Sequence, residues 1–468
     1  MAQQLTVDID RDARVPLASQ IYRVLRAGIE EGTIAPGSRL PSWRDLSAQL
    51  GVARGTVRGA YERLIDEQFA IGMGAAGTRV ARHLPARRVD TSPPEAPPLP
   101  ELYHGFGTAP LSFQMGVPSQ AAFPSILWSR LMVRGARAAA AAPVAYPDPR
   151  GDPMLRAEIA AYLAIARGIR CSPSQILITA GYSGALGLVV RGLRLEGGQA
   201  WMENPGFPLT RTALALAGMD VVAVDVDEQG LQVDRGIELA PSAALAVVTP
   251  GQQAPLGITM SLSRRLALLA WAERNGAWII EDDYLSELQL KGRAAPALAS
   301  LDRKGRVLHA GTFSKTISPT LRLGFLVVPP ELMRLFGDVA ACLAPAPTAA
   351  VQRAVAEFLR EGHHLRHLRR MKRLYHAQRQ AITRCLSDVA ADTLRISANA
   401  GLAVVATMRS DASDIDVALK ALPYGLAPAP LSPWYSGGAS RQGLLLGVTN
   451  ISSRSLEADC RRLAELAR

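Results

Sequence analysis

The stretch HAGTFSKTISPTLRLGFLVV, residues 309–328, does most to define the fold and chemistry of this chain. It places Lys315 among apolar and hydroxyl side chains, with Arg322 shortly after it. Burial disfavours the ammonium form of a lysine, so a lowered pKa would make the Lys315 amine a nucleophile toward an aldehyde. An arginine can hold a phosphate through two parallel hydrogen bonds. The stretch therefore predicts a site for a phosphorylated aldehyde, a description that fits pyridoxal 5'-phosphate (PLP).

Around this stretch, from about residue 113 onward, short apolar segments alternate with helical ones. The segments that predict strands are 176–179, 220–226, 245–249, 278–280, 307–309 and 325–328. Helical patterns such as 183–195 and 263–275 lie between many of them. This alternation predicts an α/β fold with a largely parallel sheet that is buried on both faces. After Pro347, a long charged helical region leads into a smaller α+β part.

A different pattern occupies residues 11–80. Apolar side chains at helical spacing predict an amphipathic helix over about 15–31. Ser42 with Asp45 three residues on is a variant of the capping box and starts a second helix. A third helix is expected from about Arg54 to Glu67.

The turn between the second and third helices contains Gly51, and this arrangement is the helix-turn-helix layout. The glycine-containing segment 69–80 predicts a β-hairpin, which would be a wing. Between the two patterns, proline-rich residues such as SPPEAPPLP, residues 92–100, oppose regular structure. We therefore expect a linker over 81–112 and a second domain over 113–468, with a large part about 140–345 and a small part about 346–468.

The composition limits the classes of protein. A net charge of +11 and a pI near 9.8 fit a polyanionic partner without proving one, since helices such as 364–373 can simply be solvated. The four cysteines have no paired spacing, which argues against a zinc site or a disulfide framework. The apolar runs are too short to span a membrane and no signal peptide begins the chain, so we expect a cytoplasmic protein.

The segment LPSWRDLSAQLGVARGTVRGAYERL, residues 40–64, resembles the GntR family of winged helix-turn-helix regulators. The residues that this resemblance implies for DNA contact are Arg44, Arg54, Thr56 and Arg58, with Arg79 of the wing at an adjacent groove. The start of the third helix is the end that normally faces base edges, and arginine can bind guanine bidentately. The alternative is that these arginines form surface ion pairs with Asp45, Glu62 and Asp66.

The C-terminal block resembles fold-type I aminotransferases, and the whole chain resembles the MocR-type subfamily of GntR regulators. This resemblance implies that Lys315 forms a Schiff base with PLP. In EDDY, residues 281–284, it implies that Asp282 pairs with the pyridine nitrogen and Tyr284 with the ring hydroxyl. Asp283 also satisfies the pattern, so the choice between the two acids stays open.

The resemblance also implies a phosphate site and a ring-stacking residue. The phosphate site comprises the helix start at Tyr182 and Ser183, together with Thr312 and Arg322. Phe207 would stack on the cofactor, although plain core packing is the alternative. Tyr146 matches a tyrosine that reaches the phosphate of the partner subunit, which would make the site depend on a dimer.

Some residues depart from the family pattern. In TPGQQAPLG, residues 249–257, Gln252 replaces a histidine and Ala254 an aromatic residue, which argues mildly against efficient transamination. No arginine is an obvious partner for an effector carboxylate. Arg441 and Arg211 are the candidates, and both can equally be surface arginines.

These observations predict a PLP-dependent transcription regulator. It would bind a double-stranded operator and sense an amine-bearing metabolite, or PLP itself. The family resemblance further implies a head-to-tail homodimer. One alternative is an active aminotransferase with a tethered DNA-binding domain, and a residual half-reaction is compatible with either hypothesis. Another is a DNA-binding protein whose large domain holds no cofactor.

Overall fold

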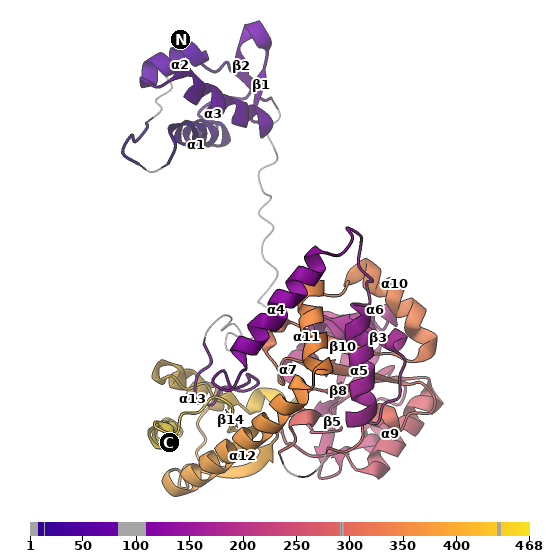
Figure 1. Ribbon diagram of the computed structural model, residues 1–468. Helices are drawn as coiled ribbons and strands as arrows, with labels where there is room; N and C mark the ends of the chain where they lie inside the picture. Colours follow the sequence, from indigo (N-terminus) through magenta and orange to yellow (C-terminus); the bar gives the residue numbers. More distant parts are fainter. Residues whose placement is uncertain (1–7, 14, 83–108, 291, 293, 438–440) are drawn as a thin grey trace. The chain divides into compact units, whose positions relative to one another are not determined.

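The computed structural model describes residues 8–13, 15–82, 109–290, 292, 294–437 and 441–468. The chain divides into two compact units, with the division between residues 97 and 98, and each unit is described by itself (Figure 1). Most of the predicted linker 81–112 lies outside the described residues.

The N-terminal unit contains three helices and one hairpin. They are α1 (Leu17–Glu30), α2 (Trp43–Leu50), α3 (Arg54–Asp66), β1 (Ala70–Gly72) and β2 (Thr78–Val80). The two strands are antiparallel, as the predicted wing requires. Leu25, Leu46 and Tyr61, one from each helix, are fully buried in a common core. The predicted helix-turn-helix with a wing is therefore confirmed.

Local sequence explains where α2 begins and ends. The Ser42 hydroxyl accepts a hydrogen bond from the Asp45 backbone N–H at 3.1 Å, and it donates one to the Asp45 carboxylate at 2.7 Å. The first of these bonds satisfies a helix-start N–H that has no partner within the helix. Gly51 has a φ of +59°, a left-handed conformation that glycine adopts at no steric cost, and it ends the helix.

The second unit is built on an eight-stranded sheet. In spatial order its strands are β3 (Ile176–Thr179), β10 (Gly324–Val327), β9 (Val307–Thr312), β8 (Trp278–Asp283), β7 (Leu245–Val248), β4 (Gln199–Asn204), β5 (Asp220–Asp227) and β6 (Gly230–Leu231). The strands from β9 to β5 are parallel, whereas β10 is antiparallel to both of its neighbours. The predicted α/β class and largely parallel sheet are confirmed. The strand β4 was missed because its polar residues dilute the apolar pattern.

Helices cover both faces of this sheet. The helices α6 (Gly181–Gly192), α7 (Pro208–Leu216) and α10 (Met333–Leu343) pack on one face. The other face carries α4 (Ser125–Ala140), α5 (Pro153–Ala166), α8 (Val233–Leu239), α9 (Leu262–Asn275) and α11 (Ala349–Arg360). Ile279 and Ile280, adjacent on β8, face opposite layers and are both buried. Burial on both faces explains the continuous apolar runs in the sequence.

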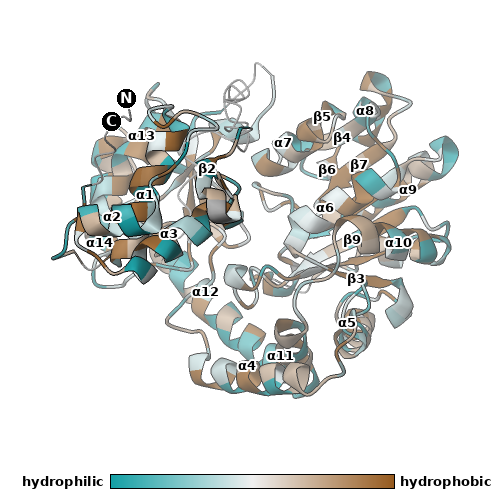
Figure 2. Cartoon of the chain, turned by 90° about the horizontal axis from the view of Figure 1, so that it is seen from above, coloured by the Kyte–Doolittle hydropathy of each residue, from teal (hydrophilic) through white to brown (hydrophobic). Residues whose placement is uncertain are grey.

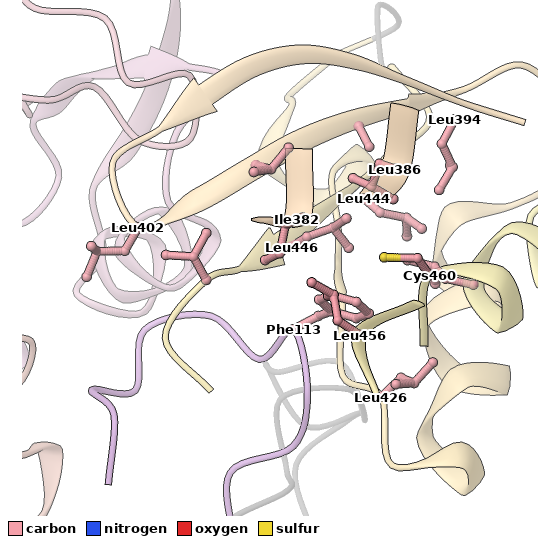
Figure 3. Packing of buried hydrophobic residues seen from close by; sticks show 14 of the residues in the cluster. Phe113, Ile382, Leu386, Leu394, Leu402, Leu426, Leu444, Leu446, Leu456 and Cys460 are labelled. Carbon is pink, nitrogen blue, oxygen red and sulfur yellow. The ribbon is translucent and has the colours of Figure 1, made fainter. Parts of the chain in front are cut away.

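A smaller layer completes the second unit. The long helix α12 (His363–Val389) leads to an antiparallel sheet in the order β11 (Leu394–Ala400), β12 (Ala403–Met408), β14 (Gly443–Gly447) and β13 (Ala429–Pro430). Helices α13 (Asp414–Ala421) and α14 (Leu456–Leu466) follow β12 and β14 in the chain. Figure 3 shows the core of this layer, where Ile382 of α12, Leu446 of β14 and Cys460 of α14 meet Phe113. Phe113 thereby anchors the segment that enters the second unit.

Within the described part of the chain, all four cysteines are free. No cluster of three or more histidine, cysteine or acidic side chains there could bind a metal ion. No helix among the described residues has the length and apolar character needed to span a membrane.

Candidate functional site

Lys315 lies just after β9, and its amine is held by the backbone. Nζ donates a hydrogen bond to the Gly116 carbonyl oxygen at 2.8 Å. A Cβ at position 116 would lie 2.6 Å from Nζ, and φ there is +78°, so this close approach requires glycine. Burial lowers the pKa of Lys315, while the nearby Asp282 carboxylate opposes that shift. Gly116 was not predicted as a site residue.

The side chains of the three acids on β8 point alternately to the two faces of the sheet. Asp283 binds the Arg167 guanidinium at 2.6 Å, and both side chains are almost completely buried. Glu281 accepts hydrogen bonds from the backbone N–H groups of Leu298 and Ala299 and contacts His309 at 3.0 Å. Glu281 and Asp283 are therefore parts of an internal ion-pair network. Because side chains alternate along a strand, Asp282 points to the other face.

Asp282 has the opposite environment. Its carboxylate is buried and has no hydrogen-bond partner among the described residues. Burial raises the pKa of Asp282 well above its ordinary value, and the negative charges of Asp283 and Glu203 raise it further, whereas Lys315 lowers it. Such a carboxyl group would be stabilised by a cationic hydrogen-bond donor.

Glu203, at the end of β4, contributes to the same electrostatic environment. Its carboxylate accepts hydrogen bonds from the Thr249 hydroxyl at 2.5 Å and the Thr249 N–H at 3.2 Å. Burial nevertheless raises the pKa of Glu203 to about 7. Glu203 was not predicted as a site residue. Its only sequence signal is its position four residues before Phe207.

The predicted phosphate residues gather where α6 begins. Gly181 has a φ of +77°, and Tyr182 and Ser183 follow it in the first turn. The Arg322 guanidinium donates to the Ala180 carbonyl at 3.4 Å, which places it beside this helix start. Thr312, at the end of β9, bonds to Ser314 through its hydroxyl at 3.1 Å. The first backbone N–H groups of a helix lack partners within it, and with an arginine beside them they suit an anion.

An aromatic cluster lies close to the acids. Phe207 packs on Trp434 with ring centroids 5.5 Å apart, and Tyr284 and Tyr435 belong to the same cluster. Burial raises the pKa of Tyr284, and the neighbouring Asp282 carboxylate raises it further. Ala254 is buried in this cluster as well. Trp434 and Tyr435 were not predicted as site residues, because they lie in a segment without a recognisable motif.

Other predicted residues have contacts of different kinds. Arg211 donates to the Ser436 hydroxyl at 2.7 Å and the Pro433 carbonyl at 2.5 Å, and so ties α7 to this turn. Arg441 is exposed. Burial raises the pKa of Tyr435, and the nearby positive charge of Arg441 opposes that rise. Gln252 donates to the Leu285 carbonyl at 3.0 Å. Tyr146 is completely exposed within a single chain, so its predicted contact with a partner subunit stays a prediction.

In the N-terminal unit, the five predicted DNA-contact residues differ in their contacts. Arg44 and Arg54 are exposed and have no ion pair among the described residues, and Thr56 is half-buried. Arg58 pairs with Glu62 at 2.7 Å, as the ion-pair alternative expects. Arg79 donates to the Gly37 carbonyl at 3.0 Å.

Arg11 supports the helix-turn-helix, a role that its sequence context did not predict. Its guanidinium donates to the Leu50 and Gly51 carbonyls at 2.9 and 3.1 Å. These carbonyls lie at the end of α2, where the last C=O groups of a helix lack partners within it. Arg11 therefore stabilises the turn that precedes α3.

Comparisons with known proteins agree with both units. Residues 17–80 match the model of the bacterial regulatory proteins of the gntR family. Residues 130–422 match aminotransferase class I and II. An archaeal alanine:glyoxylate aminotransferase has a similar structure, with a TM-score of 0.70 and 26% identity over 77% of this chain and 91% of that chain. The α-aminoadipate aminotransferase LysN of Thermus thermophilus, complexed with N-(5'-phosphopyridoxyl)-L-leucine, has a TM-score of 0.69 and 27% identity over 80% of this chain and 95% of its own.

Relatives that match along most of the chain are named as regulators. The probable rhizopine catabolism regulatory protein MocR of Rhizobium meliloti is 36% identical over 96% of this chain and 93% of its own length. The pyridoxine biosynthesis transcriptional regulator PdxR of Corynebacterium glutamicum is 31% identical, covering 96% and 95%. The regulator TauR of Rhodobacter capsulatus is 35% identical over 80% of both chains. The chain belongs to the MocR-type regulators, gntR-family transcription regulators that carry an aminotransferase-like domain. DNA binding belongs to its gntR-type unit.

Proposed function

We propose that the aminotransferase-like unit holds PLP and that an amine-bearing metabolite, or PLP itself, controls DNA binding through this site. One observation carries the proposal: Asp282 is a buried carboxylate without a partner among the described residues. Its negative charge favours the ammonium form of Lys315, and Lys315 in turn lowers the pKa of Asp282. A protonated pyridine nitrogen would supply the missing cationic donor, and an aldehyde would react with the amine. The group and the residues therefore fit each other.

The positions described above support the following proposed roles. Lys315 would hold the cofactor covalently, Asp282 would accept from its ring nitrogen and Tyr284 would donate to its ring hydroxyl. The residues proposed around the phosphate are Tyr182, Ser183, Thr312 and Arg322, with Tyr146 from the partner in a head-to-tail homodimer. Phe207 would stack on the ring. Arg441 is the better candidate for an effector carboxylate, because Arg211 is engaged by the 433–436 turn.

The chemistry of the site favours exchange of amines. Bound PLP supplies an aldehyde carbon on which one amine can replace another. Lys315 contributes an amine whose pKa burial lowers, so more of it is uncharged and nucleophilic at neutral pH. The Gly116 carbonyl orients that amine. An effector amine would displace Lys315 and shift the equilibrium between arrangements of the chain, provided that it binds one arrangement better than the other.

We propose the regulator with domains at 11–80 and 113–468, joined by the linker 81–112. Gln252 and Ala254 support regulation over turnover, because neither offers the histidine or aromatic side chain of the usual motif at its position. A true aminotransferase would instead form product from an amino acid and a 2-oxo acid at a kcat of ~1–10³ s⁻¹.

The test is the visible spectrum of the purified full chain with added PLP. We expect a Schiff-base band in the wild type and in Lys420→Ala, which changes an exposed lysine on α13, but no such band in Lys315→Ala. Titration with a panel of primary amines should shift the band for the effector class. A wild type that shows no band at saturating PLP would contradict the proposal and favour a cofactor-free domain.

A further inference from the structure

The helix α12 has an unusual charge. Among its 27 residues it contains six arginines, one lysine and a single aspartate. This helix alone supplies more than half of the chain's net charge of +11. The contacts proposed for DNA and PLP use none of these cations. The positive charge of α12 therefore has no role in either proposed site.

The cations occupy the face opposite to the core. The buried residues of α12 are His364, His367, Leu368, Met371, Tyr375, Ile382 and Leu386. At 100° per residue, the exposed Arg366, Arg369, Arg370 and Arg373 fall on the other side of the helix. We call these four residues the basic stripe. Figure 2 shows both hydrophilic and hydrophobic residues along this helix. The stripe spans about 10 Å at a rise of about 1.5 Å per residue.

Several arginines on other surface helices have acidic partners three or four residues away. Arg26 pairs with Glu30, Arg58 with Glu62 and Arg461 with Glu457. In the basic stripe, Arg366 contacts only the Glu361 carbonyl and the His363 ring among the described residues. The other three stripe arginines have no acidic partner in the described part of the chain.

This arrangement is unfavourable for the isolated chain. Like charges three or four residues apart on a helix repel each other and destabilise it. A dense line of negative charge outside the chain would remove that repulsion. Duplex DNA carries about one negative charge per 1.7 Å of its axis when both strands are counted, so about 10 Å of duplex carries about six phosphates, roughly three on each strand. The planar arginine fork matches phosphate geometry, and the lack of an acidic partner for the stripe arginines among the described residues favours a polyanion.

We infer that the basic stripe of α12 is a second DNA-contact surface, on the effector unit, which binds the phosphate backbone of duplex flanking the site bound by α3. Contacts to phosphate are independent of sequence, so this surface would add affinity without adding specificity. The inference requires no bound cofactor and stands apart from the proposed amine sensing.

The test compares two triple variants of the full chain. Arg369→Gln, Arg370→Gln and Arg373→Gln neutralise the stripe. The matched control is Arg274→Gln, Arg303→Gln and Arg334→Gln, three exposed arginines on other segments, which also lack acidic partners among the described residues. Fluorescence anisotropy gives the affinity for a 60-base-pair mixed-sequence duplex between about 50 and 200 mM salt. Each triple variant is also made with Arg54→Ala, which separates the contribution of α3.

We expect the stripe variant to lower the slope of log affinity against log salt by about two to three, since each lost phosphate contact removes about 0.9. The same decrease should occur with and without Arg54→Ala, and the control should keep the wild-type slope. An unchanged slope in the stripe variant, or an equal decrease in the control, would overturn the inference.

Two further measurements establish the folding and the association state of each variant. Circular dichroism checks folding, and the single variant Arg373→Gln, with an expected slope change of about one, replaces the triple variant if the latter is unfolded. Sedimentation reports the mass of each protein. Loss of self-association with the wild-type salt slope retained would show that a second copy of the chain covers the stripe, and this too would overturn the inference.

Discussion

At the scale of single residues, burial changes what a carboxyl group can do. Glu203 has two hydrogen bonds from Thr249, yet removal from water dominates and raises its pKa to about 7. Between pH 4.5 and 7 the folded chain therefore holds a proton at Glu203 that the unfolded chain releases. The contribution of this group to stability is fully present below about pH 4.5 and is lost as the pH rises to about 7.

Glu203→Gln should remove this pH dependence. Between pH 5 and pH 8, we expect the cofactor-free variant to gain up to about 3 kcal/mol in free energy of unfolding relative to the wild type, because glutamine has no proton to lose. Urea unfolding of both proteins across this pH range measures the difference. Glu228→Gln, at an exposed position, serves as the control and should follow the wild type. If the difference in free energy of unfolding between Glu203→Gln and the wild type stayed constant from pH 5 to pH 8, Glu203 would titrate near its ordinary pKa.

At the scale of elements, the alternation along β8 separates two adjacent acids. Asp283 faces Arg167 in a buried ion pair, and Asp282 faces the side of Lys315 without a partner among the described residues. The sequence left the choice between them open because both follow the same apolar run. The ion pair of Asp283, which joins β8 to the end of α5, is a long-range contact, and no local pattern in the sequence predicts it.

Substitution by asparagine should separate the two roles. Asp283→Asn leaves a buried guanidinium without its counter-charge, so we expect a loss of about 3–5 kcal/mol in free energy of unfolding. Asp282→Asn should retain or increase that free energy, because it removes an unpaired buried carboxyl group, but it should weaken PLP binding at least about tenfold. Chemical unfolding without cofactor and a spectroscopic PLP titration measure the two quantities. If Asp282→Asn and Asp283→Asn changed the free energy of unfolding equally, the two acids would not have the separate roles described here.

At the scale of the whole molecule, two compact units carry different tasks. The three-helix unit has its own core, and the larger unit has cores on both faces of its sheet. Changes at exposed residues of one unit should therefore be additive with changes in the other. Arg54, exposed at the start of α3 and without an ion pair among the described residues, is the suitable residue for testing this.

Arg54→Ala should weaken operator-specific binding and leave the rest of the molecule intact. Loss of one bidentate base contact costs about 1–3 kcal/mol in discrimination. Gel shift measures operator binding. Circular dichroism tests folding, and the PLP spectrum tests whether the effector unit still binds the cofactor. Arg58→Ala is an informative companion, because its pairing with Glu62 predicts a smaller loss. Wild-type operator affinity in Arg54→Ala would refute the assignment.

Much of the site could be predicted because its signals are local. Lys315, Arg322 and the start of α6 lie in short motifs, and periodicity located most strands and the three helices of the N-terminal unit. The residues that were missed act through distant contacts. Gly116 meets Lys315 across 199 positions, and Arg11 meets Gly51 across 40. The turn that carries Trp434 is bound by Arg211 from a different layer.

The sequence by itself determined the class of fold, the helix-turn-helix and the lysine motif, since propensity, capping and hydrophobic period act over a few residues. Only the tertiary structure decided which acid lacks a partner among the described residues, which arginines are engaged and which helix face remains positive. These properties depend on burial and on charges brought together from distant parts of the chain. Electrostatic energy follows distance in space, which the order of residues does not specify.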